Sequence, residues 1–283
     1  HFLDLADLAD GQLRQLLDAA AARKAARAGL PKGAVDEDAP LDGYLLAMVF
    51  EKPSTRTRLS FDMGMRQLGG QTVILNQSDM QLGRGESIAD TARVISRFAD
   101  IAMLRTGPHE TLSELAAHAR VPVINGLTAY SHPCQIVSDL MTFEEHKGKL
   151  AGQKLAWLGD GNNVALTFVH AAAQVDFELA LACPPDFSIA EAEIAAARDR
   201  GAKVTVHERA EAAAEGAAAL ITDCWVSMSD DPQEAEARAT AFQTYQVTQH
   251  LMDLGDAPIF MHCLPAYRDS EVMGEVIDGP CSV

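Results

Sequence analysis

Short runs of apolar residues alternate along the chain with longer segments in which apolar residues recur every three or four positions. The runs have the length of β-strands, and the periodic segments have the length of helices. Strands that are apolar throughout and separated by helices are typical of parallel sheets covered on both faces. The pattern therefore predicts an α/β protein. The predicted strands cover residues 44–50, 72–76, 101–105, 121–125, 154–160, 177–183, 203–208, 219–225 and 258–264.

The pattern breaks once, where glycines follow a long amphipathic helix, and then begins again. Each half holds four or five predicted strands. We therefore predict two domains, each a parallel β-sheet flanked by helices, over residues 1–132 and 149–283. The helix at 133–148 would join them. A chain of 283 residues is long enough for two domains of ordinary size.

Composition limits the kinds of partner. The formal net charge of −17 argues against a nucleic-acid surface, because binding phosphate backbones requires clustered Lys and Arg. A small anionic substrate remains compatible, since a few local arginines can dominate one cleft. No apolar run approaches the roughly 18 residues of a membrane span, so no membrane association is expected. The scattered cysteines predict reduced thiols in the cytoplasm; they are Cys134, Cys183, Cys224, Cys263 and Cys281.

The segment Ser54-Thr55-Arg56-Thr57-Arg58 lies where a predicted strand gives way to a helix. Ser54 or Thr55 is the expected N-cap of that helix. The free N–H groups and the positive dipole end of a helix form an anion site, which hydroxyl and guanidinium groups strengthen. The alternative interpretation is a capped helix whose arginines are only solvated.

Two further positions at strand ends carry polar side chains. Arg105 is the last residue of a predicted strand, and the segment S-H-P-C-Q at 131–135 follows the next one. His132 would lie at a helix N-terminus, which lowers its pKa and favours the neutral imidazole. Gln135 follows one turn into the helix. Ligands of open parallel sheets bind beyond the carboxyl ends of the strands, so these positions are candidates for a site.

Three polar motifs follow strands in the second half. The motif at 157–165 has Gly159 and Gly161 but lacks the third glycine of a dinucleotide-binding fingerprint, so it matches that fingerprint weakly. His262 and Cys263 suggest a metal, but no other His or Cys stands beside them with ligand spacing, and we expect none. A buried thiol is the alternative interpretation of Cys263. The motifs are W-L-G-D-G-N-N-V-A at 157–165, D-C-W-V-S-M at 223–228 and H-C-L-P at 262–265.

In this order, and over essentially the whole chain, the motifs resemble the aspartate/ornithine carbamoyltransferase family. S-T-R-T-R, the strand-end arginine and H-P-C-Q resemble its carbamoyl-phosphate site. H-C-L-P resembles the ornithine branch, because the aspartate branch has a P-L-P-R type segment there. The resemblance implies transfer of the carbamoyl group of carbamoyl phosphate to the δ-amine of L-ornithine, giving L-citrulline and phosphate without a cofactor or metal. It also implies a homotrimer with shared active sites.

The resemblance further implies roles for single residues. Cys263, Arg105 and His132 would be catalytic, with Cys263 as the candidate proton acceptor in its thiolate form. Gln81 would reach the carbamoyl phosphate of the neighbouring subunit. The residues implied for carbamoyl phosphate within one chain are Ser54, Thr55, Arg56, Thr57, Arg105, His132, Gln135, Cys263 and Leu264. Those implied for ornithine are Asn163, Asp223, Ser227 and Met228.

Three departures from the family pattern stand beside these matches. Ser229 replaces a usual glycine, and at a positive φ a serine would cost about 1 kcal/mol. Tyr267 replaces a second histidine, and the chain ends before a C-terminal helix that carries one more arginine for carbamoyl phosphate.

Other functions stay open: a carbamoyltransferase for acylated ornithine or putrescine, an NAD-dependent oxidoreductase that uses residues 157–165, or a non-catalytic anion-binding protein.

Overall fold

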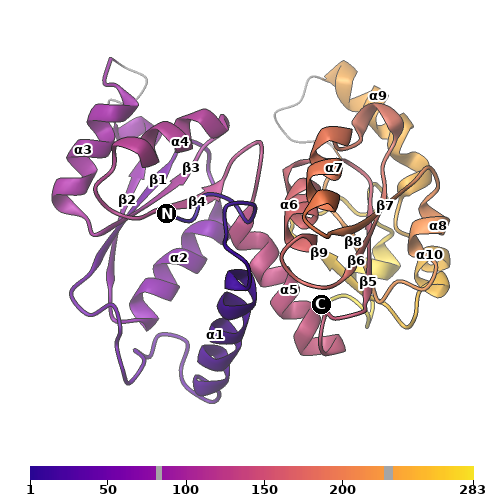
Figure 1. The fold of residues 1–283 in the computed structure, drawn as a ribbon, viewed down its shortest axis with the longest axis horizontal. Helices are drawn as coiled ribbons and strands as arrows, with labels where there is room; N and C mark the ends of the chain where they lie inside the picture. The colour runs from indigo at the N-terminus through magenta and orange to yellow at the C-terminus, as the bar shows by residue number, and fades with distance from the viewer. Residues whose placement is uncertain (81–84, 226–231) are drawn as a thin grey trace. The chain divides into compact units, whose positions relative to one another are not determined.

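The computed structural model describes the chain except residues 81–84 and 226–231. The described residues form two compact units, each built on its own parallel sheet (Figure 1). The first unit comprises residues 1–7 and 18–134, and the second comprises residues 8–17 and 135–283. The predicted α/β fold with two parallel sheets is confirmed.

The first unit contains a four-stranded parallel sheet in the order β2-β1-β3-β4. Its elements are α1 (Gln12–Ala26, shared with the second unit), β1 (Leu45–Phe50), α2 (Thr55–Gln67), β2 (Gln71–Asn76), η1 (Gln77–Asp79), α3 (Ile88–Phe98), β3 (Ile101–Arg105), α4 (His109–His118) and β4 (Val123–Leu127). Successive residues of a strand point to opposite faces. Ala47 and Val49 of β1 accordingly pack with α3 and α4, whereas Leu46 and Met48 pack with α2. The sheet is therefore covered on both faces.

The second unit contains a five-stranded parallel sheet in the order β7-β6-β5-β8-β9. Its elements are α5 (Pro133–Lys147), β5 (Lys154–Leu158), α6 (Asn163–Ala172), β6 (Glu178–Ala182), η2 (Pro185–Phe187), α7 (Glu191–Asp199), β7 (Lys203–His207), α8 (Ala210–Ala214), β8 (Ala219–Thr222), α9 (Pro232–Phe242), η3 (Gln243–Tyr245), α10 (Gln249–Leu254), β9 (Ile259–His262) and α11 (Gly274–Ile277). Ala156 and Leu158 of β5 pack with α8 and α10. Trp157 points to the other face, where its ring lies 6.0 Å from that of Phe168 in α6.

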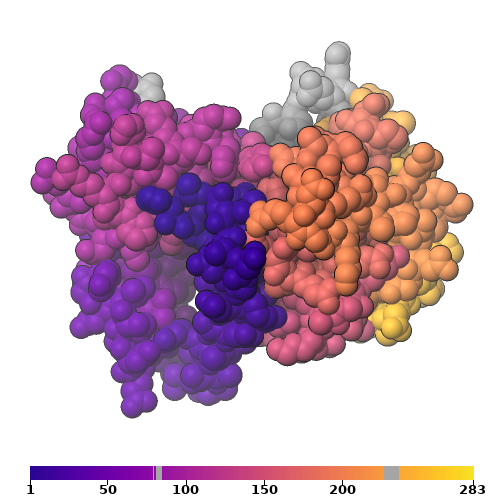
Figure 2. Space-filling view, viewed as in Figure 1, coloured from indigo at the N-terminus to yellow at the C-terminus, as the bar shows by residue number. Residues whose placement is uncertain are grey.

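The amino-terminal segment belongs to both units, which the local pattern did not predict. Arg14 of α1 forms an ion pair of 2.7 Å with Glu144 of α5, and Gln174 donates to the Leu8 carbonyl oxygen at 3.0 Å. Both contacts join residues more than 100 positions apart, beyond the reach of any periodicity argument. Helix α1 lies at the molecular surface (Figure 2), and only Leu13 and Leu17 of its residues are buried.

The predicted strands recur with boundaries shifted by no more than three residues, and β3 keeps the predicted bounds of 101–105. The helix predicted to begin at the S-T-R-T-R segment is α2, whose N-cap is Ser54. The strand predicted at 121–125 begins and ends two residues later as β4. Among the described residues, no helix has both the length and the apolar character that crossing a membrane requires.

Candidate active site

Both sheets contain a point at which the strand order reverses. In the first unit the chain passes from β1 to β2 on one side and returns to β3 on the other, and in the second unit β5 lies between β6 and β8 in the same way. Open α/β sheets bind ligands at the carboxyl ends of strands at such points. The loop at 51–54 follows β1 and Arg105 ends β3, while the loop at 159–162 and Asp223 follow β5 and β8. Four of the sequence-predicted positions thus lie at the reversals, whereas S-H-P-C-Q follows β4 and H-C-L-P ends β9, which are edge strands of their sheets.

The first turn of α2 has the structure of an anion site. Ser54 caps the helix: its Oγ accepts from the Thr57 N–H at 3.3 Å and donates to Thr57 Oγ1 at 2.9 Å. Thr55 and Arg56 are exposed in this turn. The first N–H groups of a helix have no earlier carbonyl to bond, and the helix dipole adds positive charge. A hollow of about 540 Å³, partly lined by Ser54, Thr55 and Arg58, gives solvent access to the turn.

Arg105 joins the end of β3 to this turn. Its guanidinium donates to Thr57 Oγ1 at 3.2 Å and to the Gly126 carbonyl oxygen at 3.4 Å. Burial, together with the charge of Arg105, lowers the pKa of His132 to about 3. His132 is therefore neutral at physiological pH, as the sequence predicted. The physical cause is burial and the guanidinium, whereas the prediction rested on the helix terminus.

In the second unit, Gln135 and Asp139 form a pair on α5. Gln135 Nε2 donates to Asp139 Oδ1 at 2.7 Å. Burial raises the pKa of Asp139 to about 7; the bond from Gln135 opposes this rise, and the charge of Asp223 adds to it. Because the amide nitrogen of Gln135 is directed to Asp139, its carbonyl oxygen is the atom that can accept a bond from an N–H donor on a ligand.

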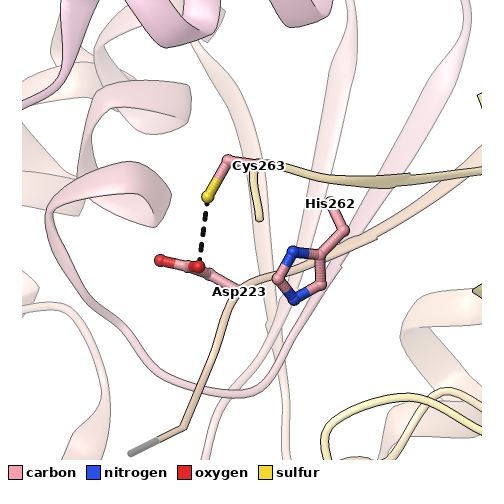
Figure 3. Close-up of side chains that lie close together, drawn as sticks. All are labelled: Asp223, His262 and Cys263. Atoms are coloured by element: carbon pink, nitrogen blue, oxygen red, sulfur yellow. Dashed lines mark hydrogen bonds between the residues drawn. The ribbon is translucent and has the colours of Figure 1, made fainter. Parts of the chain in front are cut away.

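The Asp223 carboxylate is held by donors from three segments. Its Oδ1 accepts from the Cys224 N–H at 2.8 Å and from the Cys263 thiol at 3.1 Å (Figure 3). Its Oδ2 accepts from Asn162 Nδ2 at 3.0 Å. Asn162 is itself fixed, since its Oδ1 caps α6 by accepting from the Val164 N–H at 2.9 Å. The carboxylate therefore has a defined orientation at the carboxyl ends of β8 and β9.

Cys263 is a thiol in this environment. Burial raises its pKa well above the ordinary value, and the neighbouring Asp223 carboxylate raises it further. The S–H group donates to Asp223, which also favours the protonated form. The thiolate that the sequence suggested is therefore disfavoured by the structure.

Asp223, His262 and Cys263 are the one group of potential metal ligands found in the described part of the chain. Their donor atoms lie within 4.8 Å of one another (Figure 3). However, His262 Nδ1 already accepts from the Leu264 N–H at 2.9 Å, and its Nε2 faces Glu271 at 3.3 Å. A metal requires a deprotonated thiol and an available imidazole nitrogen. The described contacts form a hydrogen-bonded network and do not present these ligands to a cation.

Comparison with known proteins fixes the family. Residues 1–145 match the aspartate/ornithine carbamoyltransferase, carbamoyl-P binding domain, and residues 151–283 match the Asp/Orn binding domain of the same proteins. The chain belongs to the aspartate/ornithine carbamoyltransferase family. Together the two matches include nearly every residue of the chain.

Similar members of this family include proteins named ornithine carbamoyltransferase. The one from Cereibacter sphaeroides strain KD131 is 52% identical, with all of this chain and 92% of the relative aligned. The one from Rhodopseudomonas palustris is 54% identical, covering all of this chain and 90% of that protein. The solved structure of ornithine carbamoyltransferase from Pyrococcus furiosus superimposes with a TM-score of 0.92 at 40% identity, over all of this chain and 90% of the other.

The remaining residues expected from the carbamoyltransferase pattern fall into two groups. Asn163 is the first residue of α6, directly after the cap that holds Asp223. Leu264 is half exposed, with a φ of +58°, and its N–H donates to His262. The others lie outside the described residues: Gln81, Ser227, Met228 and the departure Ser229.

Three residues in contact with the expected carbamoyltransferase site were not singled out from the sequence as site residues. Asp139 lies four positions after Gln135, a helical spacing that could have indicated their contact. Asn162 precedes Asn163, and the preference of Asn for helix N-caps was the available indication. His262 was considered only as a metal ligand, and its partner Glu271 is nine positions away in an irregular segment. No local pattern predicts that contact.

Proposed function

We propose that this protein is an ornithine carbamoyltransferase, which converts carbamoyl phosphate and L-ornithine to L-citrulline and phosphate. The observation that carries the proposal is the Arg105 guanidinium, bonded to Thr57 in the capped first turn of α2, with the neutral His132 beside it. Phosphate oxygens favour charge-assisted donors at a helix N-terminus, and a carbonyl oxygen favours N–H donors. The relatives' names support ornithine as the amine.

The reaction forms one bond and breaks one. The δ-amine attacks the carbonyl carbon, and the C=O electron pair moves to the oxygen. When that pair returns, the C–O bond to phosphate breaks and phosphate leaves. Arg105 and His132 would stabilise the negative charge on the carbonyl oxygen, and such donors typically contribute about 3 kcal/mol each. Gln135 would accept from the carbamoyl NH₂ group through its carbonyl oxygen.

The second unit would bind the amino acid. Asp223 offers an oriented carboxylate for the α-ammonium group, and Asn163 offers an amide for the α-carboxylate. Cys263 and the Leu264 backbone would border the δ-amine. Because Cys263 is held as a thiol, we assign the proton released by the amine to the departing phosphate rather than to a thiolate.

An amine panel tests this function. Purified protein would receive carbamoyl phosphate with L-ornithine, N-acetylornithine or putrescine, in the presence of a metal chelator, and the carbamoylated products would be measured. We expect citrulline from ornithine and at least about 100-fold lower kcat/KM for the other amines, because a site built for charged ammonium and carboxylate groups rejects analogues without them. Faster turnover of another amine would overturn the substrate assignment.

We also propose a cytoplasmic homotrimer in which Gln81 serves the site of the neighbouring subunit. The family resemblance supports the assembly. All five cysteines are free thiols, which supports a reducing compartment.

A further inference from the structure

Asn125 of β4 is a fully buried polar residue that the proposed chemistry does not use. Burying an amide is costly unless its donor and acceptor groups are bonded. Nδ2 of Asn125 donates to the Leu3 carbonyl oxygen at 2.9 Å and to Ser131 Oγ at 3.0 Å. Oδ1 accepts from the Leu127 N–H at 2.8 Å. One side chain therefore joins the amino-terminal segment, the end of β4 and the residue directly before His132.

The bond from Leu127 closes a bulge in β4. The residue of β3 that follows the partner of Asn125 is Arg105, and it pairs with Leu127, so Gly126 is an extra residue on β4. A side chain at position 126 would collide with the sulfur of Met103, so only glycine fits there. Leu127 has a φ of +145°, which is unfavourable for leucine, and the bond of its N–H to Asn125 offsets part of that strain.

This bulge provides an acceptor for the strand-end arginine. The Gly126 carbonyl oxygen accepts from the Arg105 guanidinium at 3.4 Å. Bulges commonly redirect groups beside active sites, because the extra residue changes the local direction of the strand. By fixing the N–H of Leu127, the side-chain oxygen of Asn125 therefore helps to fix a partner of Arg105.

The bond to Ser131 holds the turn that precedes His132. Ser131 is fully buried, and its backbone bonds to Thr128 in both directions. Its carbonyl oxygen accepts from the Thr128 N–H at 3.0 Å, and its N–H donates to Thr128 Oγ1 at 3.1 Å. The chain passes from Ser131 directly to His132 and then to Pro133, the first residue of α5. The backbone of His132 is therefore held from its amino-terminal side by this turn.

The two ends of one amide thus lead to the two donors expected to stabilise the carbonyl oxygen of carbamoyl phosphate. Oδ1 acts through the bulge on Arg105, and Nδ2 acts through Ser131 on His132. Donors of this kind are effective when they are held in place before the reaction, and a displacement of about 1 Å can cost about 100-fold in rate.

We propose that Asn125 is a positioning residue for both Arg105 and His132. Because Asn125 is fully buried, it would touch neither substrate and would act only through these two residues. The inference rests on the proposed function and deepens it, since it names the residue that keeps the two donors in register with each other.

Two substitutions test the two ends of the amide. Ser131→Ala removes the Oγ acceptor and leaves Asn125 and the bulge in place, whereas Asn125→Ala removes both connections. We expect Ser131→Ala to lower kcat about tenfold and Asn125→Ala to lower it about 100-fold or more. The KM values of both substrates should stay within about threefold, because the lost orientation matters most in the transition state. Steady-state kinetics would measure both parameters.

Ser96→Ala is the matched control. Ser96 lies in α3 of the same unit, where its Oγ donates to the Ala92 carbonyl oxygen at 2.7 Å and accepts from the Arg120 N–H at 2.9 Å. Losing these bonds should lower the melting temperature about as much as Ser131→Ala does, while kcat stays within about twofold of the wild type. A kcat of Ser131→Ala equal to that of Ser96→Ala would overturn the proposal, whether or not Asn125→Ala folds.

Crystal structures without substrate keep this inference separate from the proposed function. In Ser131→Ala we expect His132 to move by about 0.5 Å or more while Arg105 keeps its bond to Gly126. His132 in the wild-type position would refute the positioning role even if citrulline forms. Conversely, a displaced His132 in a protein whose wild type makes no citrulline would remove the proposed function and leave the positioning by Asn125 standing.

Discussion

His132 and Cys263 show how burial sets the chemistry of single residues. Burial and the charge of Arg105 lower the pKa of His132, so its imidazole donates as a neutral group. Burial and the charge of Asp223 raise the pKa of Cys263, so its sulfur stays protonated. In both cases desolvation favours the uncharged form. Neither side chain therefore contributes a full charge, and the positive charge at the end of β3 is that of Arg105.

Arg56 and Arg105 should be far more important for turnover than Arg58. Arg105 contacts the α2 turn directly, and Arg56 is exposed within that turn. Arg58 instead helps to lower the pKa of Asp62, four positions further along the helix. We expect Arg56→Ala and Arg105→Ala each to reduce kcat/KM by about 100-fold or more, and Arg58→Ala by less than about fivefold. Steady-state kinetics would measure this, and equal losses at 56 and 58 would contradict it.

Asp139 should make stability depend on pH. Its folded-state pKa is about 7, against an ordinary value of 3.8, so the folded protein keeps a proton that the unfolded chain releases. The stability that the folded protein gains from binding this proton is fully present below pH ~4 and is lost as the pH rises to ~7. Asparagine does not titrate, so Asp139→Asn should escape this loss. As the pH rises from ~4 to ~7, its free energy of unfolding should therefore increase relative to that of the wild type by about 2 kcal/mol, a value reduced because the Asp139 side chain is partly exposed.

Urea unfolding of both proteins at pH ~4.5 and pH ~8 would measure this difference. Asp186→Asn is the control, because Asp186 is exposed on the surface of the second unit. If Asp139→Asn and wild type change in parallel with pH, Asp139 does not carry the proton assigned to it.

At the scale of the element, Ser54 at the N-terminus of α2 has two roles: it caps the helix, and we expect it to bind phosphate. Ser54→Ala should lose about 1 kcal/mol of stability with the cap, and phosphate affinity should fall with it. Ser54→Asp should keep the cap, because aspartate caps as well as serine, yet repel phosphate by its charge. Thermal melting and equilibrium binding of carbamoyl phosphate separate the two effects.

Thr248→Ala serves as the control, since Thr248 caps α10 by accepting from the Leu251 N–H at 3.3 Å. It should lose comparable stability and retain phosphate affinity. Undiminished phosphate binding in Ser54→Asp would show that the anion lies away from this helix terminus.

At the scale of the whole molecule, the proposed trimer makes a complementation test possible. Arg105→Ala and Gln81→Ala proteins, each inactive, would be unfolded together and refolded. If each site takes Arg105 from one chain and Gln81 from the next, about a quarter of sites in random trimers receive both wild-type residues. We expect about a quarter of wild-type activity to return. No recovery, with hybrid trimers confirmed by mass spectrometry, would refute shared sites.

The sequence alone determined the succession of strands and helices along the chain and the candidate positions for chemistry at the strand ends. Apolar runs and helical periods predicted both parallel sheets, because burial on two faces requires strands without polar positions. Ser54 or Thr55 was predicted as the N-cap, because a hydroxyl satisfies a free N–H of the first turn, and the cap is Ser54. Such features depend on residues within a few positions of one another, which a sequence displays directly.

Only the tertiary structure decided the contacts between distant segments and the protonation states that follow from them. Arg14 pairs with Glu144, and Cys263 donates to Asp223 across 40 positions. The state of the Cys263 thiol depends on desolvation and on one neighbouring carboxylate, and neither is visible in the residues adjacent to it. Local order follows from local chemistry, whereas the electrostatics of the site depend on which groups the fold brings together.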